Sequence, residues 1–321
     1  MKGFPKLKLK SKNFLTKIFA TFGLKLYLGL LLIAVLLFAA DFKVNADLNK
    51  GAVLGVSYPV EKSEYPVLKT TYVPQITARG AVVMDADSKV ILYQKNPNLR
   101  FSSASTVKIM TAITALDYFN LHDFLTVKKA TTEGVILGLK DGQKITFENL
   151  LYALLLPSAN DIALTIAQNF SSSNDKSEDA FIKKMNQNTV KFNLYNTHYE
   201  DPAGLLDDGD YTTPLDLARL SSIAIKNEVF AKIVSTREKT INDYDGNNYS
   251  LKNLNKLLGF ENVNGIKTGT TQGARQVLVT SKKEGEHTII IVVMDSEDRF
   301  SDTKKLLNMI SGNITYLPIH P

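Results

Sequence analysis

Strand-like sequence stands at both ends of the longest globular part of this chain, and helix-like sequence fills the middle. Residues 78–96 hold two β-rich runs around a turn, and residues 265–295 hold further strands. Between and after them, apolar residues recur three and four apart, which predicts helices over 107–116, 146–170 with a break at Pro157, 177–193, 213–235 and 301–314. Strands from the two ends must then pair around a helical middle. This order predicts an α+β domain with one antiparallel sheet.

The first 46 residues carry the features of a membrane-targeting segment. Residues 1–40 contain seven lysines and no acidic residue, and residues 26–40 form an uncharged apolar run. A basic flank before an apolar run keeps the lysines in the cytoplasm and exports all that follows. Two outcomes stay open: an uncleaved anchor over 18–40, about 23 residues and long enough to span a bilayer, or a signal peptide cleaved at the small residues of 44–46. We favour the anchor.

The remaining chain divides simply. Residues 47–77 are mixed in composition with scattered prolines, which is typical of a linker. The chain is thus predicted to have three parts. Residues 1–46 are the anchor or signal peptide, residues 47–77 are the linker, and residues 78–317 are the folded domain.

The basic composition does not indicate a nucleic-acid partner. The formal net charge is +6, and setting aside the seven N-terminal lysines leaves −1 for residues 41–321, so no phosphate-binding surface is expected. The chain has no cysteine, which excludes disulfides, thiol nucleophiles and Cys-ligated metals. Its four histidines lack metal-binding spacing, and we expect no metal and no organic cofactor.

Ser105 and Lys108 stand three residues apart at the predicted start of a helix, hence on one helix face. A serine hydroxyl becomes a good nucleophile only when a base takes its proton, and lysine can do so only when neutral. Lowering a lysine pKa from about 10.4 to about 7 or 8 takes roughly 3 to 5 kcal/mol, which burial and a second cation can supply. Alone, the pair is better explained by a helix cap, from Ser102, Ser103 or Ser105, followed by a surface lysine.

Two more segments change that balance. Ser158 and Asn160 follow Pro157 at the predicted helix break, which turns a hydroxyl and a carboxamide towards a cleft. The Lys-Thr-Gly of 267–269 lies on a predicted strand, where a glycine often marks the close approach of another backbone. Each segment alone fits an ordinary loop or surface strand. Together and in this order, S-x-x-K, S-x-N and K-T-G are the motifs of penicillin-binding proteins and class A β-lactamases.

From about Ala78 to about Ile314 the chain resembles the low-molecular-mass penicillin-binding proteins of the D-alanyl-D-alanine carboxypeptidase type. The likeness includes the motifs and the phrases over 138–163, 196–220 and 263–271. It implies a β-lactamase/transpeptidase-like fold, an antiparallel sheet flanked by helices plus a helical subdomain. It also implies a serine peptidase that removes the terminal D-alanine of peptidoglycan stem peptides and is acylated by β-lactams as covalent inhibitors. We expect it at the extracytoplasmic face of the bacterial membrane, or in the periplasm or wall if the signal is cleaved.

The resemblance also implies a role for each matching residue. Ser105 would be the acyl-accepting nucleophile and Lys108 its general base, with Lys267 as the cation that helps to keep Lys108 neutral. Ser158 would relay a proton to the departing amine. Asn160 would hold Lys108 and the substrate amide.

The substrate-binding residues follow in the same way. The backbone N–H groups of Ser105 and Thr270 would form the oxyanion hole, beside Gly269 of the motif. Thr268 and Arg299 would bind the terminal carboxylate. One departure stands out: the phrase "DPAGL" has Ala203 where the family often has histidine or serine, and no role is assigned to that position.

Two other functions remain possible on these motifs. A serine β-lactamase of class A would need a glutamate on an E-x-x-x-N phrase on a loop between the second and third motifs. Among the glutamates between Asn160 and Lys267 only Glu238, with Asn242, has this spacing, and we do not assign it that role. A non-catalytic wall-binding or penicillin-sensing module would not need Ser105, Lys108 and Lys267 intact. We also expect a retained anchor because the chain ends soon after the predicted catalytic domain.

Overall fold

The computed structural model describes residues 32, 33, 35, 36, 63–171 and 176–319. The chain divides into two compact units, Met1–Glu61 and Lys62–Pro321. In the first unit only the four residues between 32 and 36 are described, and they are helical. Nearly all of the predicted membrane segment therefore lies outside the described residues. Within the described part, no helix has both the length and the apolar character needed to cross a bilayer.

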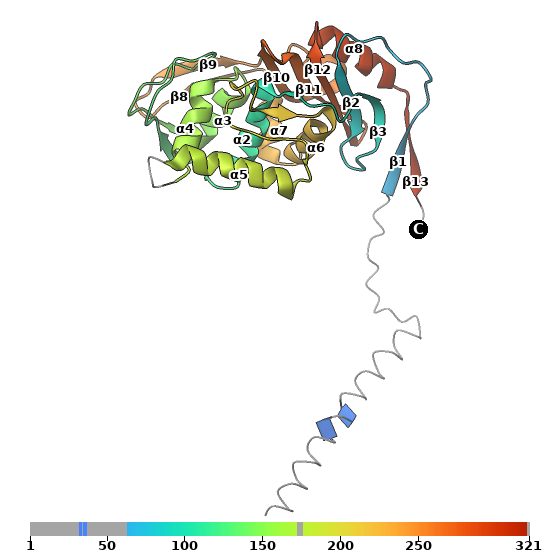
Figure 1. Ribbon diagram of the computed structural model, residues 1–321, viewed down its shortest axis with the longest axis horizontal. Coiled ribbons are helices and arrows are strands. Elements are labelled where there is room, and N and C mark those ends of the chain that lie inside the picture. Colours follow the sequence, from blue (N-terminus) through green and yellow to red (C-terminus); the bar gives the residue numbers. More distant parts are fainter. Residues whose placement is uncertain (1–31, 34, 37–62, 172–175, 320–321) are drawn as a thin grey trace, which may run out of the picture. The chain divides into compact units, whose positions relative to one another are not determined.

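The centre of the second unit is a five-stranded antiparallel sheet (Figure 1). Its order is β10-β11-β12-β2-β3, so strands from both ends of the sequence pair side by side at β12 and β2. The strands are β2 (Gly80–Asp85), β3 (Ile91–Lys95), β10 (Val263–Thr271), β11 (Arg275–Glu284) and β12 (His287–Ser296). The α+β prediction is confirmed.

Alternate residues of the central strands serve two different cores. Val82 of β2 and Val292 of β12 belong to the larger apolar cluster, which includes the helical part of the domain. Val83 and Val293, their next neighbours, belong to a second cluster with Leu306 and others of α8 (Arg299–Ile310). Successive side chains of a strand point to opposite faces. The sheet is therefore covered on one face by α8 and on the other by the helical part.

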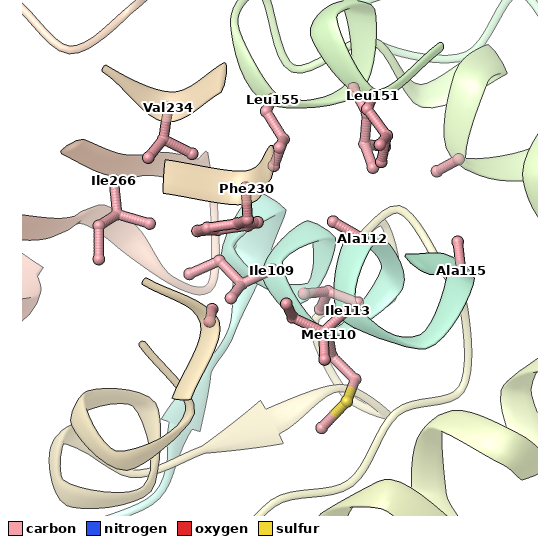
Figure 2. Close-up of a cluster of buried hydrophobic side chains, with 14 of the residues drawn as sticks. Ile109, Met110, Ala112, Ile113, Ala115, Leu151, Leu155, Phe230, Val234 and Ile266 are labelled. Carbon is pink, nitrogen blue, oxygen red and sulfur yellow. The ribbon is translucent and has the colours of Figure 1, made fainter. Parts of the chain in front are cut away.

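The helical part is built around α2, which packs on four other helices. Its helices are α2 (Val107–Leu116), α3 (Phe147–Leu155), α4 (Asn160–Gln168), α5 (Ser177–Lys191), α6 (Pro214–Ala224) and α7 (Glu228–Val234). Figure 2 shows how α2 meets its neighbours: Ile109 lies near Phe230 of α7, and Leu155 of α3 and Ile266 of β10 close the same cluster. These contacts hold the α2 start beside the edge strand β10.

Four short strand pairs complete the domain. They are β1 (Ser63–Leu68) with β13 (Ile314–Ile319), β4 (Phe101–Ser102) with β7 (Tyr211–Thr212), β5 (Phe124–Thr126) with β6 (Lys144–Thr146), and β8 (Glu238–Asn242) with β9 (Asn248–Lys252).

Two predictions about the elements need correction. Residues 63–68, assigned to a linker ending at 77, form strand β1, because they pair with β13 from the far end of the sequence. The single helix predicted over 213–235 is two helices, α6 and α7. The side chain of Asn227 accepts a hydrogen bond from the N–H of Phe230 and so starts a new helix there.

Candidate active site

Ser105 lies in a short 3₁₀ turn, η1 (Ala104–Thr106), directly before α2. Ala104 has φ +45°, a left-handed conformation that is uncommon for a residue with a side chain. Gly269 of β10 fits closely here, since an added Cβ would lie 3.1 Å from the Cβ of Ala104 and 3.3 Å from the N of Ser105. The predicted serine cap is wrong: neither η1 nor α2 has a side-chain cap. Ser105 is half-buried, and its Oγ accepts a hydrogen bond from Lys108.

Lys108 is fully buried on the first turn of α2. Its Nζ donates hydrogen bonds to Ser105 Oγ at 3.0 Å, to Asn160 Oδ1 at 2.8 Å and to the carbonyl of Ala203 at 2.5 Å. The contact between serine and lysine that the sequence predicted is therefore present, and the lysine is not on the surface.

Burial lowers the pKa of Lys108 to about 7, although the charges of Asp201, Asp210 and Asp161 act to raise it. A group with this pKa is substantially neutral at physiological pH. Such an amine can accept the proton of a hydroxyl 3.0 Å away.

Ser158 and Asn160 lie at the break between α3 and α4, as predicted from Pro157. Ser158 has φ +70° and is 4% exposed, and its Oγ has no hydrogen-bond partner among the described residues. Asn160 begins α4, and its Nδ2 donates to the carbonyl of Glu133 at 3.0 Å while its Oδ1 accepts from Lys108. The carboxamide is thus fixed between the lysine and a neighbouring loop, and a hydroxyl without a partner stands two residues before it.

Lys267 is buried on β10, and its Nζ donates to the carbonyl of Thr268 at 3.0 Å. Its pKa is lowered well below the usual value, by burial first and then by the charges of Lys108 and Arg299. Two buried ammonium groups that repel each other do not both keep their protons at neutral pH. The two lysines therefore form a coupled pair in one buried site.

Arg299 is the first residue of α8 and reaches the end of the K-T-G strand. Its guanidinium donates to the carbonyl of Gly269 at 2.7 Å and to Thr270 Oγ1 at 2.6 Å. Its buried Nε has no partner among the described residues. Thr268, predicted to share the carboxylate with Arg299, is only 4% exposed, whereas Thr270 is exposed. A cation with an unused donor thus lies beside the exposed end of the motif.

The sequence did not predict two features of this site. It assigned no part to Ala203, yet the backbone carbonyl of that residue is a direct partner of Lys108. Nor did it single out Asp207, whose carboxylate accepts hydrogen bonds from Ser102, Thr271 and the N–H of Gly273. This aspartate joins the strand before the nucleophile turn to the end of β10. The only sequence signal was the resemblance of the phrase around 203 to its family.

No three His, Cys, Asp or Glu side chains in the described part of the chain gather closely enough to hold a metal ion. The chemistry available here is that of a hydroxyl, two amines, a carboxamide and a guanidinium. An acyl transfer to serine uses these groups.

Comparisons with known proteins agree with this geometry. The family model described as D-alanyl-D-alanine carboxypeptidase matches residues 67–298. The D-alanyl-D-alanine carboxypeptidase DacF of Bacillus subtilis is 29% identical over 76% of this chain and 64% of its own length. The D-alanyl-D-alanine carboxypeptidase of Streptomyces sp. K15 is 33% identical over 73% of this chain and 87% of its own.

A solved structure shows the same fold. The crystal structure of the Streptomyces K15 DD-transpeptidase has a TM-score of 0.71 and 32% identity, covering 75% of this chain and 99% of that one. The predicted β-lactamase/transpeptidase-like fold and the predicted serine peptidase class are thereby confirmed. The family model's range, residues 67–298, includes the turn of Ser105 and the strand of Lys267. By motif, fold and sequence, the chain belongs to the D-alanyl-D-alanine carboxypeptidase family of serine peptidases.

Proposed function

We propose that this protein removes the terminal D-alanine from peptidoglycan stem peptides through an acyl-enzyme on Ser105. One observation carries the proposal: a fully buried lysine, Lys108, lies 3.0 Å from the hydroxyl of that serine with its pKa lowered to about 7. A surface lysine would be protonated and could not act as a base.

In the acylation step, neutral Lys108 takes the proton of Ser105 Oγ as the oxygen attacks the carbonyl of the D-Ala-D-Ala bond. The backbone N–H groups of Ser105 and Thr270 receive the developing oxyanion. Lys108 passes the proton that it has taken to Ser158, whose Oγ has no other partner among the described residues. Ser158 gives its own proton to the amine of the leaving D-alanine, and Lys108 is neutral again. The bond from the carbonyl carbon to that nitrogen breaks, and an ester on Ser105 remains.

In the deacylation step, water attacks the ester carbonyl and the neutral lysine accepts a proton from it. The bond from the carbonyl carbon to Ser105 Oγ then breaks, the lysine returns the proton to that oxygen, and the shortened peptide leaves as its carboxylate. Asn160 keeps Lys108 in place through both steps, since it bonds to the amine at 2.8 Å. Lys267 is the second amine of the coupled pair, and a proton on either lysine disfavours a proton on the other. No metal enters either step.

The terminal carboxylate of the substrate is assigned to Arg299 and Thr268, with Gly269 giving the peptide backbone room to approach. Arg299 already bonds to Gly269 and Thr270 at the exposed end of the strand. An incoming carboxylate can pair with its remaining donors in the bidentate geometry that guanidinium favours.

The setting of the enzyme belongs to the same proposal. We assign residues 1–46 to the anchor or signal and the catalytic domain to the folded part up to 317. The protein then acts at the outer face of the cell membrane, where its wall substrate lies. β-Lactams acylate Ser105 because their amide occupies the place of the scissile bond.

Two assays on the full-length protein in detergent test the activity. Incubation with diacetyl-lysyl-D-Ala-D-Ala should release free D-alanine, and fluorescent penicillin should leave one covalent adduct, mapped by mass spectrometry to Ser105. Ser105→Ala should lose both signals. Ser103→Ala is the matched control, because that nearby hydroxyl is buried without a partner and should be dispensable. An adduct on any other residue contradicts the assignment.

A second activity is favoured by the Streptomyces K15 relative, which bears both the name carboxypeptidase and the name DD-transpeptidase. An amine in place of water would turn hydrolysis into peptide transfer. Adding a glycyl-glycine acceptor to the peptide assay separates the two, since a transpeptidase yields a new peptide product. Steady hydrolysis of nitrocefin, instead of one stoichiometric burst, would indicate a β-lactamase.

A further inference from the structure

The loop of residues 201–206 is organised by a single carboxylate. Asp201 Oδ1 accepts the N–H groups of Ala203 and Gly204, both at 2.6 Å. Its Oδ2 accepts those of Leu205 at 2.8 Å and Leu206 at 3.0 Å. Four successive donors on one anion leave the loop little freedom to take another conformation.

This loop contacts both the turn of the nucleophile and the lysine base. Ala203 presents its carbonyl to Lys108 Nζ at 2.5 Å. Gly204 lies so close to η1 that an added Cβ would stand 2.0 Å from the carbonyl oxygen of Ala104. With φ +78°, the glycine also takes a backbone conformation that suits no larger residue well. A change in the conformation of the loop would therefore displace Lys108 or the turn that carries Ser105.

A second carboxyl lies behind the first. Asp210 Oδ1 accepts the N–H of Glu200 at 2.7 Å, and the carbonyl of Asp210 accepts the N–H of Ser103 at 3.2 Å. Burial raises the pKa of Asp210 to about 8, helped by a hydrogen bond to Asp201 and by its charge. Asp210 therefore keeps its proton to a higher pH than an ordinary aspartate.

We propose that Asp201 is a positioning residue for the lysine base: its carboxylate shapes the 201–206 loop, fixes the Ala203 carbonyl on Lys108 and places a negative charge two residues from that carbonyl. The inference rests on the proposed function, since it gives Asp201 a part in the acylation of Ser105. The titratable groups around the buried lysine are Asp201 and Asp210 from this segment and Asp161 from α4, and the amine of Lys267 on β10 is affected in turn by the charge of Lys108.

Two separable effects follow from this arrangement. The shape of the loop governs how fast the correctly protonated enzyme is acylated. The charge governs the pH at which Lys108 becomes neutral, because an anion nearby favours the ammonium form. A residue with a structural role alone would change the acylation rate at high pH and would not change the pH at which Lys108 becomes neutral.

The test compares acylation rates by fluorescent penicillin between pH 5 and 9, on full-length protein. For Asp201→Asn we expect the rate at high pH to fall about 10- to 100-fold, as misplacement of a catalytic group does. We also expect the acid limb of the profile to move about half a unit to one unit to lower pH, since the variant loses an anion that acts on Lys108. Asp201→Glu should keep the acid limb where it is.

Gly204→Ala tests the loop without changing any charge. It should lower the plateau rate and leave the acid limb unmoved. Asp243→Asn is the control, because Asp243 is a buried aspartate that holds the distant 243–247 turn through Asp245 and Asn247 in the same way. It should behave as wild type in both respects.

Each possible result either supports the proposal or overturns it. If the acylation rate of Asp201→Asn rises with pH at the same place as that of the wild type, the charge effect is overturned, whatever rate the variant reaches at high pH. If Asp201→Asn does not fold, Gly204→Ala still decides, because a wild-type plateau there overturns the positioning role of the loop. Wild-type protein that is not acylated at all would refute the proposed function, which is a different outcome.

Discussion

Acylation of Ser105 should depend on pH as a buried lysine base dictates. Burial lowers the pKa of Lys108 to about 7, so the neutral amine dominates above that pH. The second-order rate constant for acylation should be about tenfold lower at pH 6 than at pH 8, and should fall about tenfold for each further unit. A lysine with the ordinary pKa of about 10.4 would place the same rise about three units higher.

Lys108→Arg is the decisive change, because a guanidinium keeps the positive charge and does not give up its proton. We expect acylation at pH 8 to fall about 10²- to 10⁴-fold, the usual contribution of a general base, and the acid limb to disappear. Time courses of fluorescent-penicillin labelling at six pH values measure both. Lys283→Arg, at an exposed position of β11, is the matched control.

Two results would refute this reasoning. Wild-type protein labelled at the same rate at pH 6 and pH 8 would mean that no group with a pKa near 7 controls the step. Wild-type rates in Lys108→Arg would mean that the lysine is not the base.

Three further predictions concern stability and substrate binding. Asp210 has its pKa raised to about 8 in the folded chain, so it keeps a proton that the unfolded chain has lost; stability should fall as pH rises from about 4 to about 8, and Asp210→Asn should flatten that fall in denaturant titrations at each pH. Phe230→Ala should lower the free energy of unfolding by about 3 to 5 kcal/mol, measured in urea, because that ring is fully buried beside α2; an unchanged midpoint would contradict the packing. Arg299→Leu should raise KM for the free-acid peptide about tenfold or more, as expected for a lost charged hydrogen bond, and leave KM for the C-terminally amidated peptide unchanged; an equal effect on both peptides would exclude a carboxylate role.

The sequence predicted those parts of the fold that depend on local patterns. The β-rich runs of β2 and β12 and the helix break at Pro157 are visible in a few neighbouring residues, and the structure has both. The order of the three motifs also placed Ser105, Lys108 and Asn160 in one family site, and the structure brings these three side chains into contact.

The missed features depend on residues far apart in the chain. Strand β1 forms only because β13, about 250 residues later, pairs with it. The carbonyl of Ala203 is backbone, so its contact with Lys108 leaves no mark in the identity of its side chain. Asp201 looks like any aspartate before a proline. Its importance is visible only in the hydrogen bonds that it accepts from four backbone N–H groups.

Two glycines from distant segments close on the nucleophile turn, Gly204 from one side and Gly269 from β10. Neither segment can reach that turn until the sheet edge and the helical part have docked. Covalent labelling by penicillin should therefore report the completion of folding as well as catalytic competence. Refolding protein sampled with short pulses of fluorescent penicillin would show the moment at which the last of these pieces arrives.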